Sequence, residues 1–280
     1  MKDFRDKVVV ITGAGSGIGR ATALAFAREG SKLHISDINR ERIEKVAQEI
    51  RDLGAEATPY LVDSTDREAM RKFTEDVYAN AGRVDILHNN AGIGAGGRLE
   101  EIPLEHWEKI IAINLWGVIY GVHYFLPRMI AQGGGGNIVN TASGAGLIGM
   151  PGFAHYATTK FAVVGLSEVM SIDLKKHGIH TTVVCPGIIY TNIINDTLFE
   201  MADDQKEKVR KTVNSFYEKS GVGPEVVARD ILRAVRKNKP IVVSPWYQMY
   251  PVWILKRLSV RLYQFSARVV GDRLMTKLGV

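Results

Sequence analysis

Short runs of β-branched residues alternate with helical patterns along most of the chain. In the helical stretches apolar residues recur every three or four positions, as at Ile43, Val46 and Ile50, and this is the spacing of one helix face. Strands that alternate with helices form a parallel sheet covered on both faces, so the pattern predicts a doubly wound α/β fold. The predicted strands are Lys7–Thr12, Lys32–Ser36, Ala57–Val62, Val84–His88, Asn137–Thr141, His180–Cys185 and Ile241–Ser244.

The pattern divides the chain into one domain, residues 1–244, and an extension, residues 245–280. A chain of 280 residues, of which 46% are apolar, can bury a large core without covalent cross-links. The single cysteine, Cys185, excludes an intramolecular disulfide and a cysteine-based zinc site. No apolar run approaches ~18 residues, so we expect no transmembrane helix. Because no signal-peptide pattern precedes the first strand either, we expect a cytoplasmic protein.

Positive charge is concentrated in the extension. The whole chain has a formal net charge of +6, and residues 245–280 contribute +5 of it, so the domain is nearly neutral. Charge confined to one end differs from the basic stripe of a duplex-binding protein, and we expect no nucleic-acid partner. The charge is equally compatible with contact to an anionic membrane surface and with a solvated helix face.

A glycine-rich turn follows the first predicted strand. Gly13, Gly17 and Gly19 have the spacing G-x-x-x-G-x-G at the start of a predicted helix, where glycine lets backbone N–H groups approach a phosphate. Asp37 ends the second strand, 20 residues after Gly17. A carboxylate there would bind the ribose hydroxyls of NAD and repel the 2′-phosphate of NADP. Arg40 would weaken that preference, and the alternative role of Asp37 is to satisfy backbone donors at a helix start.

Four polar residues indicate proton-transfer chemistry. Tyr156 and Lys160 stand four residues apart at the start of a predicted helix, so their side chains share one face. A phenol is a poor base near neutral pH, and we expect the ammonium group and a nicotinamide cation to lower its pKa. Ser143 would donate a hydrogen bond to a substrate oxygen. Asn114 lies among apolar helix positions, where a buried amide needs partners.

A set of short motifs occurs in one order along about residues 5–245: Thr12-Gly13-x-x-x-Gly17-x-Gly19, Asp63, Asn89-Asn90-Ala91-Gly92, Asn114, Ser143, Tyr156-x-x-x-Lys160 and Pro186-Gly187. With these motifs the chain resembles the short-chain dehydrogenase/reductase family. The resemblance implies a Rossmann-type domain with a seven-stranded parallel sheet and a homodimer or homotetramer built on the helices around Asn114 and Tyr156. It also implies that Tyr156 takes the alcohol proton while hydride passes to NAD, and that Asn114 holds a water near Lys160.

The resemblance assigns further contacts with the cofactor. It implies that Asp63 binds the adenine, that the backbone of residues 90–92 lies beside the ribose, and that residues 186–191 meet the nicotinamide. The expected catalytic residues are Asn114, Ser143, Tyr156 and Lys160. The expected cofactor-binding residues are Gly13, Ser16, Gly17, Ile18, Gly19, Asp37, Asp63, Asn90, Ala91, Gly92, Tyr156, Lys160, Pro186, Gly187, Ile189 and Thr191.

In this family the segment after Thr191 forms a lid over the substrate, here about residues 192–220. Its apolar residues and those that follow Ser143 predict a hydrophobic pocket without an arginine to bind a carboxylate. We therefore expect a hydrophobic secondary alcohol or ketone as substrate, and the alternative is that these side chains only pack the lid. The apolar residues concerned are Leu147, Ile148, Met150, Phe153, Ile193, Ile194, Leu198, Phe199 and Met201.

The extension departs from the family pattern and predicts a basic amphipathic helix. Its apolar positions are Leu255, Leu258, Leu262, Phe265 and Val269, its basic positions are Lys256, Arg257, Arg261 and Arg268, and four aromatic residues, Trp246, Tyr247, Tyr250 and Trp253, precede them. Such a helix can bind the headgroup region of an anionic membrane. It would equally cover the substrate cleft of its own chain or contact a partner subunit.

Three other functions fit parts of the pattern. A 3-oxoacyl-thioester reductase shares the family motifs but usually uses NADPH, and Asp37 and the extension count against it. A non-catalytic NAD-binding scaffold at a membrane would have lost part of the catalytic set, which is complete here. A hydrolase would use His155 with Ser143, but no acidic residue is evidently placed to orient the ring. Taken singly, Tyr156, Lys160 and Ser143 also fit ordinary surface or capping roles.

Overall fold

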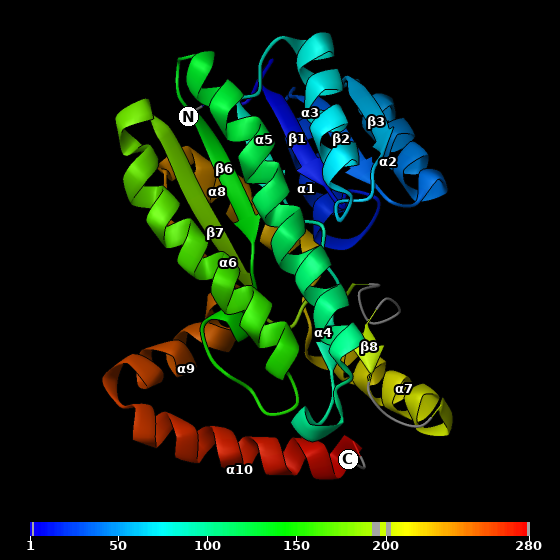
Figure 1. Cartoon of the computed structure of the whole chain (residues 1–280), viewed down its shortest axis with the longest axis vertical. Coiled ribbons are helices and arrows are strands. Elements are labelled where there is room, and N and C mark those ends of the chain that lie inside the picture. Colours follow the sequence, from blue (N-terminus) through cyan, green and yellow to red (C-terminus); the bar gives the residue numbers. More distant parts are fainter. Residues whose placement is uncertain (2, 192–196, 200–202, 279–280) are drawn as a thin grey trace.

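Seven parallel strands form the central sheet (Figure 1), in the order β3-β2-β1-β4-β6-β7-β9. The computed structural model describes residues 1, 3–191, 197–199 and 203–278. The predicted doubly wound, Rossmann-type fold is therefore confirmed. The strands are β1 (Val8–Thr12), β2 (Lys32–Asp37), β3 (Ala57–Leu61), β4 (Ile86–Asn89), β6 (Gly136–Thr141), β7 (Ile179–Pro186) and β9 (Ile241–Ser244).

Two helical layers cover the sheet because successive side chains of a strand point to opposite faces. In β1, Val9 and Ile11 pack into one core cluster, and Val8 and Val10 pack into another on the opposite face. With both faces covered, the strands read as nearly continuous apolar runs. One layer consists of α1 (Gly17–Arg28), α2 (Arg40–Asp52) and α8 (Pro224–Lys237), and the other of α3 (Arg67–Ala81), α5 (Gly117–Ala131) and α6 (Ala154–Asp173).

The order of the strands creates a crevice at one edge of the sheet. From β1 the chain builds outward through β2 and β3, and it then returns to place β4 on the other side of β1. The loops that leave β1 and β4 therefore diverge at the carboxyl ends of the strands, which is where doubly wound sheets bind ligands. A separate two-residue pairing, β5 (Ala95–Gly96) with β8 (Leu198–Phe199), lies outside the main sheet.

One helical run combines α4 (Leu104–Ile111), a π-helical turn (Ala112–Trp116) and α5. Within the described part of the chain it is the one helix long and apolar enough to cross a membrane, with a mean hydropathy of 1.4. The expectation from uninterrupted apolar runs missed it because polar residues punctuate the run. In the fold, Phe125 and Met129 of α5 pack in the same core cluster as Leu87 of β4, so its apolar face covers the sheet.

The extension forms two helices instead of the single amphipathic helix that the sequence predicts. Helix α9 (Trp246–Leu258) and helix α10 (Val260–Leu278) meet at Ser259, whose backbone is extended. They pack on the turn between β6 and α6, and α10 runs along the lower edge of the view in Figure 1. On α10 Tyr263 is the buried residue, while Leu262 and Phe265 of the predicted apolar side are exposed, so the role of that side stays a prediction.

Candidate active site

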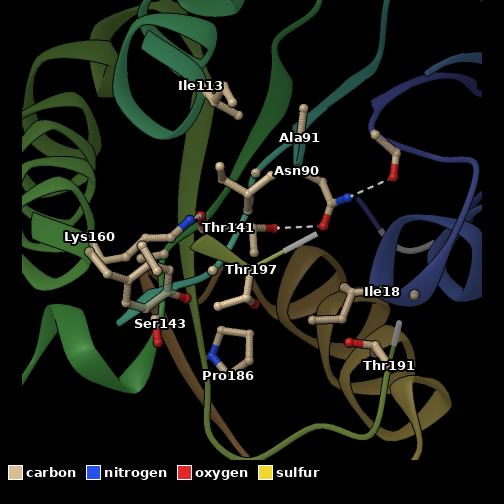
Figure 2. A pocket seen from close by; sticks show the side chains of 18 of the residues that line it. Ile18, Asn90, Ala91, Ile113, Thr141, Ser143, Lys160, Pro186, Thr191 and Thr197 are labelled. Carbon is tan, nitrogen blue, oxygen red and sulfur yellow. Dashed lines mark hydrogen bonds between the residues drawn. The ribbon is translucent and has the colours of Figure 1, made fainter. Parts of the chain in front are cut away.

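A cavity of about 820 Å³ lies at the carboxyl ends of β1, β2, β4, β6 and β7. Figure 2 shows that side chains from these separate segments converge on it. The turn after β1 borders one side, and the start of α6 borders the other. We name these the glycine end, residues 13–19 with Asp37, and the tyrosine end, which consists of Ser143, Tyr156 and Lys160.

Most of the predicted site residues line this cavity. Gly19 lies behind it and supports the glycine turn, and Asn114 lies behind the tyrosine end. The predicted residues on the cavity wall are Gly13, Ser16, Gly17, Ile18, Asp37, Asp63, Asn90, Ala91, Gly92, Ser143, Tyr156, Lys160, Pro186, Gly187, Ile189 and Thr191.

At the glycine end, close packing leaves no space for a Cβ atom at Gly13 or Gly19. Gly13 and Gly17 have φ angles of +62° and +52°, a region that glycine adopts without strain. A Cβ atom at Gly13 would lie 2.7 Å from the Cα atom of Ala91, and a Cβ atom at Gly19 would collide with the carbonyl oxygen of Gly13. The first residues of α1 therefore present backbone N–H groups to the cavity, as a phosphate-binding turn requires.

The Asp37 carboxylate is buried at the end of β2 and lines the cavity. One oxygen accepts a hydrogen bond from the backbone N–H of Gly15 (2.9 Å) and the other from that of Asn39 (2.9 Å). The two expectations for this residue thus coexist, because it satisfies backbone donors and still faces the cavity. The cation beside it is Arg42, at 3.6 Å, and not the expected Arg40.

A polar network joins the ends of β1, β4 and β6. The Asn90 side chain donates to the carbonyl oxygens of Thr12 (3.2 Å) and Gly13 (3.1 Å). Its own oxygen accepts a hydrogen bond from the Thr141 hydroxyl at 3.2 Å (Figure 2). Asp63 accepts from the backbone N–H and the hydroxyl of Thr65, both at 2.8 Å, and so turns the loop after β3 toward the cavity. Thr141 was not among the expected site residues, although its position at the end of a predicted strand placed it at this edge.

At the tyrosine end, burial shifts the pKa values of Lys160 and Tyr156. The Lys160 ammonium donates to the Thr141 carbonyl oxygen at 3.2 Å and lies 5.6 Å from the centre of the Tyr156 ring. Burial lowers the pKa of Lys160 to about 8. Burial also raises the pKa of Tyr156 to about 12, although its hydrogen bond with Ser143 acts in the opposite direction. In the protein alone desolvation penalises the phenolate, and the expected lowering of the phenol pKa by a bound nicotinamide cation stays a prediction.

Asn114 is fully buried within the π-helical turn. Its amide accepts from the Ile93 backbone N–H (2.9 Å) and donates to the Ile93 carbonyl oxygen (3.0 Å) and to the Thr159 hydroxyl (3.4 Å). A Cβ atom at Gly92 would lie 3.0 Å from the Asn114 oxygen and 3.4 Å from the Lys160 ammonium. The amide therefore fixes the segment after β4 against α6, and the expected water beside it stays a prediction.

The apolar residues after Ser143 divide into two groups. Met150 and Phe153 line the cavity. Leu147 and Ile148 instead pack into a core cluster with Tyr263 of α10, so their assignment to the substrate pocket is wrong. In the lid, Leu198 belongs to β8, while Ile193, Ile194 and Met201 lie outside the described residues.

The cavity wall also includes residues from segments that the motifs do not cover. Thr197 precedes β8, Val213 and Tyr217 lie on α7 (Asp203–Ser220), and Met249 lies on α9. No local pattern marks them, because each reaches the cavity only through the packing of a distant segment. His155 does not line the cavity. Its ring lies 5.7 Å from that of Trp107, and burial lowers its pKa to about 4, so a hydrolytic pair with Ser143 is not formed.

The cavity has the parts that a dinucleotide needs. The turn at Gly13 and Gly19 has no space for a Cβ atom, and the Asp37 carboxylate faces the cavity a short distance along the same edge of the sheet. This is the arrangement that a phosphate-binding turn and a ribose-binding carboxylate would require. In the described part of the chain no group of three or more histidine, cysteine, aspartate or glutamate residues is arranged to hold a metal ion.

Comparison with known proteins agrees with this geometry. The sequence pattern of the short chain dehydrogenase family matches residues 7–201. The chain is 39% identical over 270 residues to the "Probable oxidoreductase EphD" of Mycobacterium tuberculosis, covering 95% of this chain and 45% of EphD. The chain thus spans about half the length of that relative. It is also 41% identical over 201 residues to the "Cyclohexanol dehydrogenase" of an Acinetobacter species, covering 71% and 79% of the two chains.

A solved structure is similar along nearly the whole chain. It is a short chain dehydrogenase/reductase from Burkholderia phymatum in complex with NAD, with a TM-score of 0.86 and 28% sequence identity. The likeness covers 94% of this chain and 96% of that one. By its sequence pattern, its relatives and its fold, the chain belongs to the short chain dehydrogenase family.

Proposed function

We propose that the protein is an NAD(H)-dependent oxidoreductase that interconverts a hydrophobic secondary alcohol and its ketone. One observation carries the proposal. A single cavity runs from a glycine turn and a ribose-binding carboxylate, Asp37, to a tyrosine and lysine, Tyr156 and Lys160, at the start of α6. When bound, NAD supplies the acceptor or donor of hydride, and the residues of the chain supply geometry and the proton.

Asp37 supports NAD rather than NADP as the cofactor. Its carboxylate is buried, and among the described residues each oxygen accepts one backbone N–H, so lone pairs remain for ribose hydroxyl groups. A 2′-phosphate at the same place would bring a second negative charge against a buried one. Arg42 lies 3.6 Å from the carboxylate and reduces this repulsion without removing it.

Tyr156 acts as the acid and base in the proposal. Because burial raises its pKa to about 12, the phenol is protonated at neutral pH and ready to give a proton to a ketone oxygen. Ser143 hydrogen-bonds the same phenol and would donate to the substrate oxygen as charge develops there. Lys160, held by the Thr141 carbonyl oxygen, would favour the phenolate electrostatically when an alcohol is oxidised.

The side chains around the tyrosine end support an apolar substrate. Met150, Phe153, Ile188, Val213 and Met249 line the cavity. Among the described lining residues the arginine is Arg42, and it lies at the glycine end. A carboxylate-bearing substrate would therefore have no arginine partner beside Tyr156. The similarity to a cyclohexanol dehydrogenase favours the same substrate class.

The test is a spectrophotometric panel of hydrophobic secondary alcohols, small polyols and a 3-oxoacyl thioester, each with NAD(H) and NADP(H). We expect turnover of the hydrophobic alcohols with NAD⁺, and we expect Tyr156→Phe to lower kcat by roughly 10³-fold, within the range for a lost general acid or base. The variant should still bind NADH, as measured by fluorescence. Activity confined to polyols, or to the thioester with NADPH, would overturn the substrate assignment.

An oligomer built on α5 and α6 is part of the proposal. Trp116, Phe161, Val169 and Ile172 are 38–72% exposed along these helices, and an apolar groove between the helices is lined by Ile119, Val122, His123, Leu126, Pro127 and Leu166. Such a patch favours association with a second copy of the chain. We expect Ile172→Asp to convert an oligomer into a monomer in analytical ultracentrifugation, and Leu104→Asp, exposed elsewhere, to leave it unchanged.

Contact with an anionic membrane is proposed for the outer side of α10. On α10 Leu262, Phe265 and Val269 are 38–68% exposed, and Leu258 at the end of α9 is 81% exposed. Residues 245–280 contain six basic residues and one acidic residue, Asp272. An apolar stripe among arginines suits the boundary between headgroups and acyl chains, and each arginine would add ~1 kcal/mol at an anionic surface.

Vesicle co-sedimentation tests the membrane proposal on the full chain. We expect the parent protein to pellet with phosphatidylglycerol vesicles and to bind phosphatidylcholine vesicles about tenfold more weakly. Phe265→Ser should bind phosphatidylglycerol vesicles about tenfold more weakly, because an aromatic side chain contributes ~1.5–3 kcal/mol on burial. Gln264→Ser, which changes an exposed polar neighbour, should pellet like the parent. If the parent protein pellets equally with both lipids, and the two variants pellet equally with each other, the membrane proposal is overturned.

A further inference from the structure

The extension contributes a side chain to the tyrosine end of the cavity. Met249 of α9 is the one described residue beyond position 244 on the cavity wall. A Cβ atom at Gly144, next to Ser143, would lie 2.5 Å from the Met249 Cε atom, and a Cβ atom at Gly187 would lie 3.3 Å from its Cγ atom. The thioether side chain therefore fills the space between the turn after β6 and the turn after β7.

Gln248 holds this part of α9 against the cavity. Its side-chain oxygen accepts a hydrogen bond from the Ile188 backbone N–H at 2.7 Å, and its side-chain nitrogen donates to the Ser220 carbonyl oxygen at 3.2 Å. Ile188 lies directly after β7 and lines the cavity, and Ser220 ends α7, the helix of the lid. One amide thus joins the extension, the turn after β7 and the lid helix.

Two contacts farther along the extension fix the turn after β6. The Lys256 ammonium donates to the Leu147 carbonyl oxygen at 2.8 Å, and the Tyr263 hydroxyl donates to the Gly149 carbonyl oxygen. Val252, Trp253 and Leu255 pack in the same core cluster as Leu147. With α9 attached on both sides of Met249, its side chain has a defined place and cannot swing away as a free terminal segment would.

We propose that Met249 is a specificity-determining residue whose side chain sets the size of the alcohol or ketone that fits beside Tyr156, with Gln248 as the residue that positions it. The inference rests on the proposed function, since it names the wall of that same site. Methionine is unbranched, so its replacement changes the volume of the wall in a graded way. In a hydrophobic pocket one methylene group is worth about tenfold or more in kcat/KM.

The experiment compares two variants with opposite changes in volume. Met249→Ala enlarges the space and Met249→Phe narrows it, and each full-length protein is assayed with NAD⁺ on cyclohexanol and cyclododecanol. We expect the ratio of kcat/KM for cyclododecanol over cyclohexanol to rise about tenfold in Met249→Ala and to fall about tenfold in Met249→Phe. Trp246→Ala, an exposed residue on the same helix, should keep the parent ratio. A folding defect would lower both substrates equally and leave the ratio unchanged.

A binding measurement separates this inference from the proposed function. The dissociation constants of the two alcohols are measured on the NADH-loaded proteins through NADH fluorescence. If the parent turns over the alcohols and every variant has the same ratio of kcat/KM for cyclododecanol over cyclohexanol, the role of Met249 is overturned and the proposed function stands. A second outcome is that no protein turns over either alcohol, while the ratio of the two dissociation constants shifts in opposite directions in the two Met249 variants. This outcome would overturn the proposed function and support Met249 as part of the cavity wall.

Discussion

The glycine end of the cavity is built from residues 13–19 and Asp37, whereas the cavity wall around the tyrosine end gathers side chains from positions 143 to 249. At the glycine end the decisive contacts are made by backbone, with Gly13 and Gly19 packed where no Cβ atom fits. At the tyrosine end they are made by side chains from the turn after β6, α6, α7 and α9. The backbone contacts of Gly13 and Gly19 therefore tolerate almost no substitution. The side chains around the tyrosine end can change, and with them the substrate space, without a change in the fold.

Among the variants that distinguish the two ends, Gly19→Ala should have the largest effect on stability and on NADH affinity. Its Cβ atom would collide with the Gly13 carbonyl oxygen and lie 2.6 Å from the Asn90 side-chain nitrogen. We expect a loss of 1–3 kcal/mol in the free energy of unfolding, as for other overpacked sites, and about a 100-fold weaker affinity for NADH, measured by fluorescence titration.

Gly165→Ala is the matched control for that change. Gly165 lies within α6, and a Cβ atom there would meet nothing within 4 Å, so alanine should leave NADH affinity unchanged and slightly stabilise the helix. Equal losses in the two variants would show that the glycine end does not depend on close backbone packing.

The next effect concerns the charge at the glycine end. Asp37→Asn keeps an oxygen for the Gly15 N–H but removes the negative charge. We expect the ratio of kcat/KM with NADP⁺ over that with NAD⁺ to rise by ~10- to 100-fold, which corresponds to ~1.4–2.8 kcal/mol. The ratio of activities on large and small alcohols should not move, since that property belongs to the tyrosine end. A cofactor ratio that does not change would argue against Asp37 as the ribose-binding residue.

A smaller effect is expected for the hydrogen bonds that join the extension to the lid. Gln248→Ala removes the bonds to Ile188 and Ser220, each worth about 0.5–1.5 kcal/mol. We expect the KM for alcohols to rise about three- to tenfold, while kcat and the KM for NAD⁺ change by less than about twofold. Gln264→Ala, on the exposed side of α10, is the control. A fall in kcat alone would contradict a positioning role.

The smallest effect tests whether burial governs the charges of the tyrosine end. Burial lowers the pKa of Lys160 from 10.5 to about 8, so between these values the unfolded chain binds more protons than the folded one. The free energy of unfolding should therefore rise with pH in this range, by about 1 kcal/mol per pH unit. Denaturant unfolding at about pH 8 and pH 9.5 measures it, and Lys160→Met should lose this rise.

Tyr156 should change the free energy of unfolding with pH in the opposite direction. Its pKa is raised from 10.0 to about 12, so the folded chain keeps a proton that the unfolded chain loses above pH 10, and stability should fall there as pH increases. A parent protein whose stability does not rise between about pH 8 and 9.5 relative to Lys160→Met would show that the ammonium is solvated or paired, and that burial does not set its pKa.

Much of the glycine end was predictable because its chemistry is local. The turn from β1 to α1 and the carboxylate at the end of β2 are read from strand ends and glycine spacing, and parallel strands must bring these ends to one edge. The four-residue separation of Tyr156 and Lys160 likewise fixes their common helix face. The extent of burial around these two residues could not be read from the sequence, and in the protein alone it raises the pKa of Tyr156.

The stretch after Ser143 shows why the remainder was not predictable. Leu147, Ile148, Met150 and Phe153 are equally apolar, and the sequence assigned all four to the substrate pocket. Only Met150 and Phe153 line it, because α9 and α10 cover the other two. The same packing explains α10, where Tyr263 is buried against Gly149 and the regular apolar stripe stays outside.

The sequence by itself determined the order of strands and helices, the glycine turn, and the positions of the four polar residues from Asn114 to Lys160. It did so because period, turn chemistry and helix spacing act over a few residues. Only the tertiary structure decided which apolar side chains face the cavity and that Met249 is among them. Those outcomes depend on the packing of Met249 and its helix, and Met249 lies 93 residues after Tyr156. Burial between such distant segments leaves no local pattern in the chain.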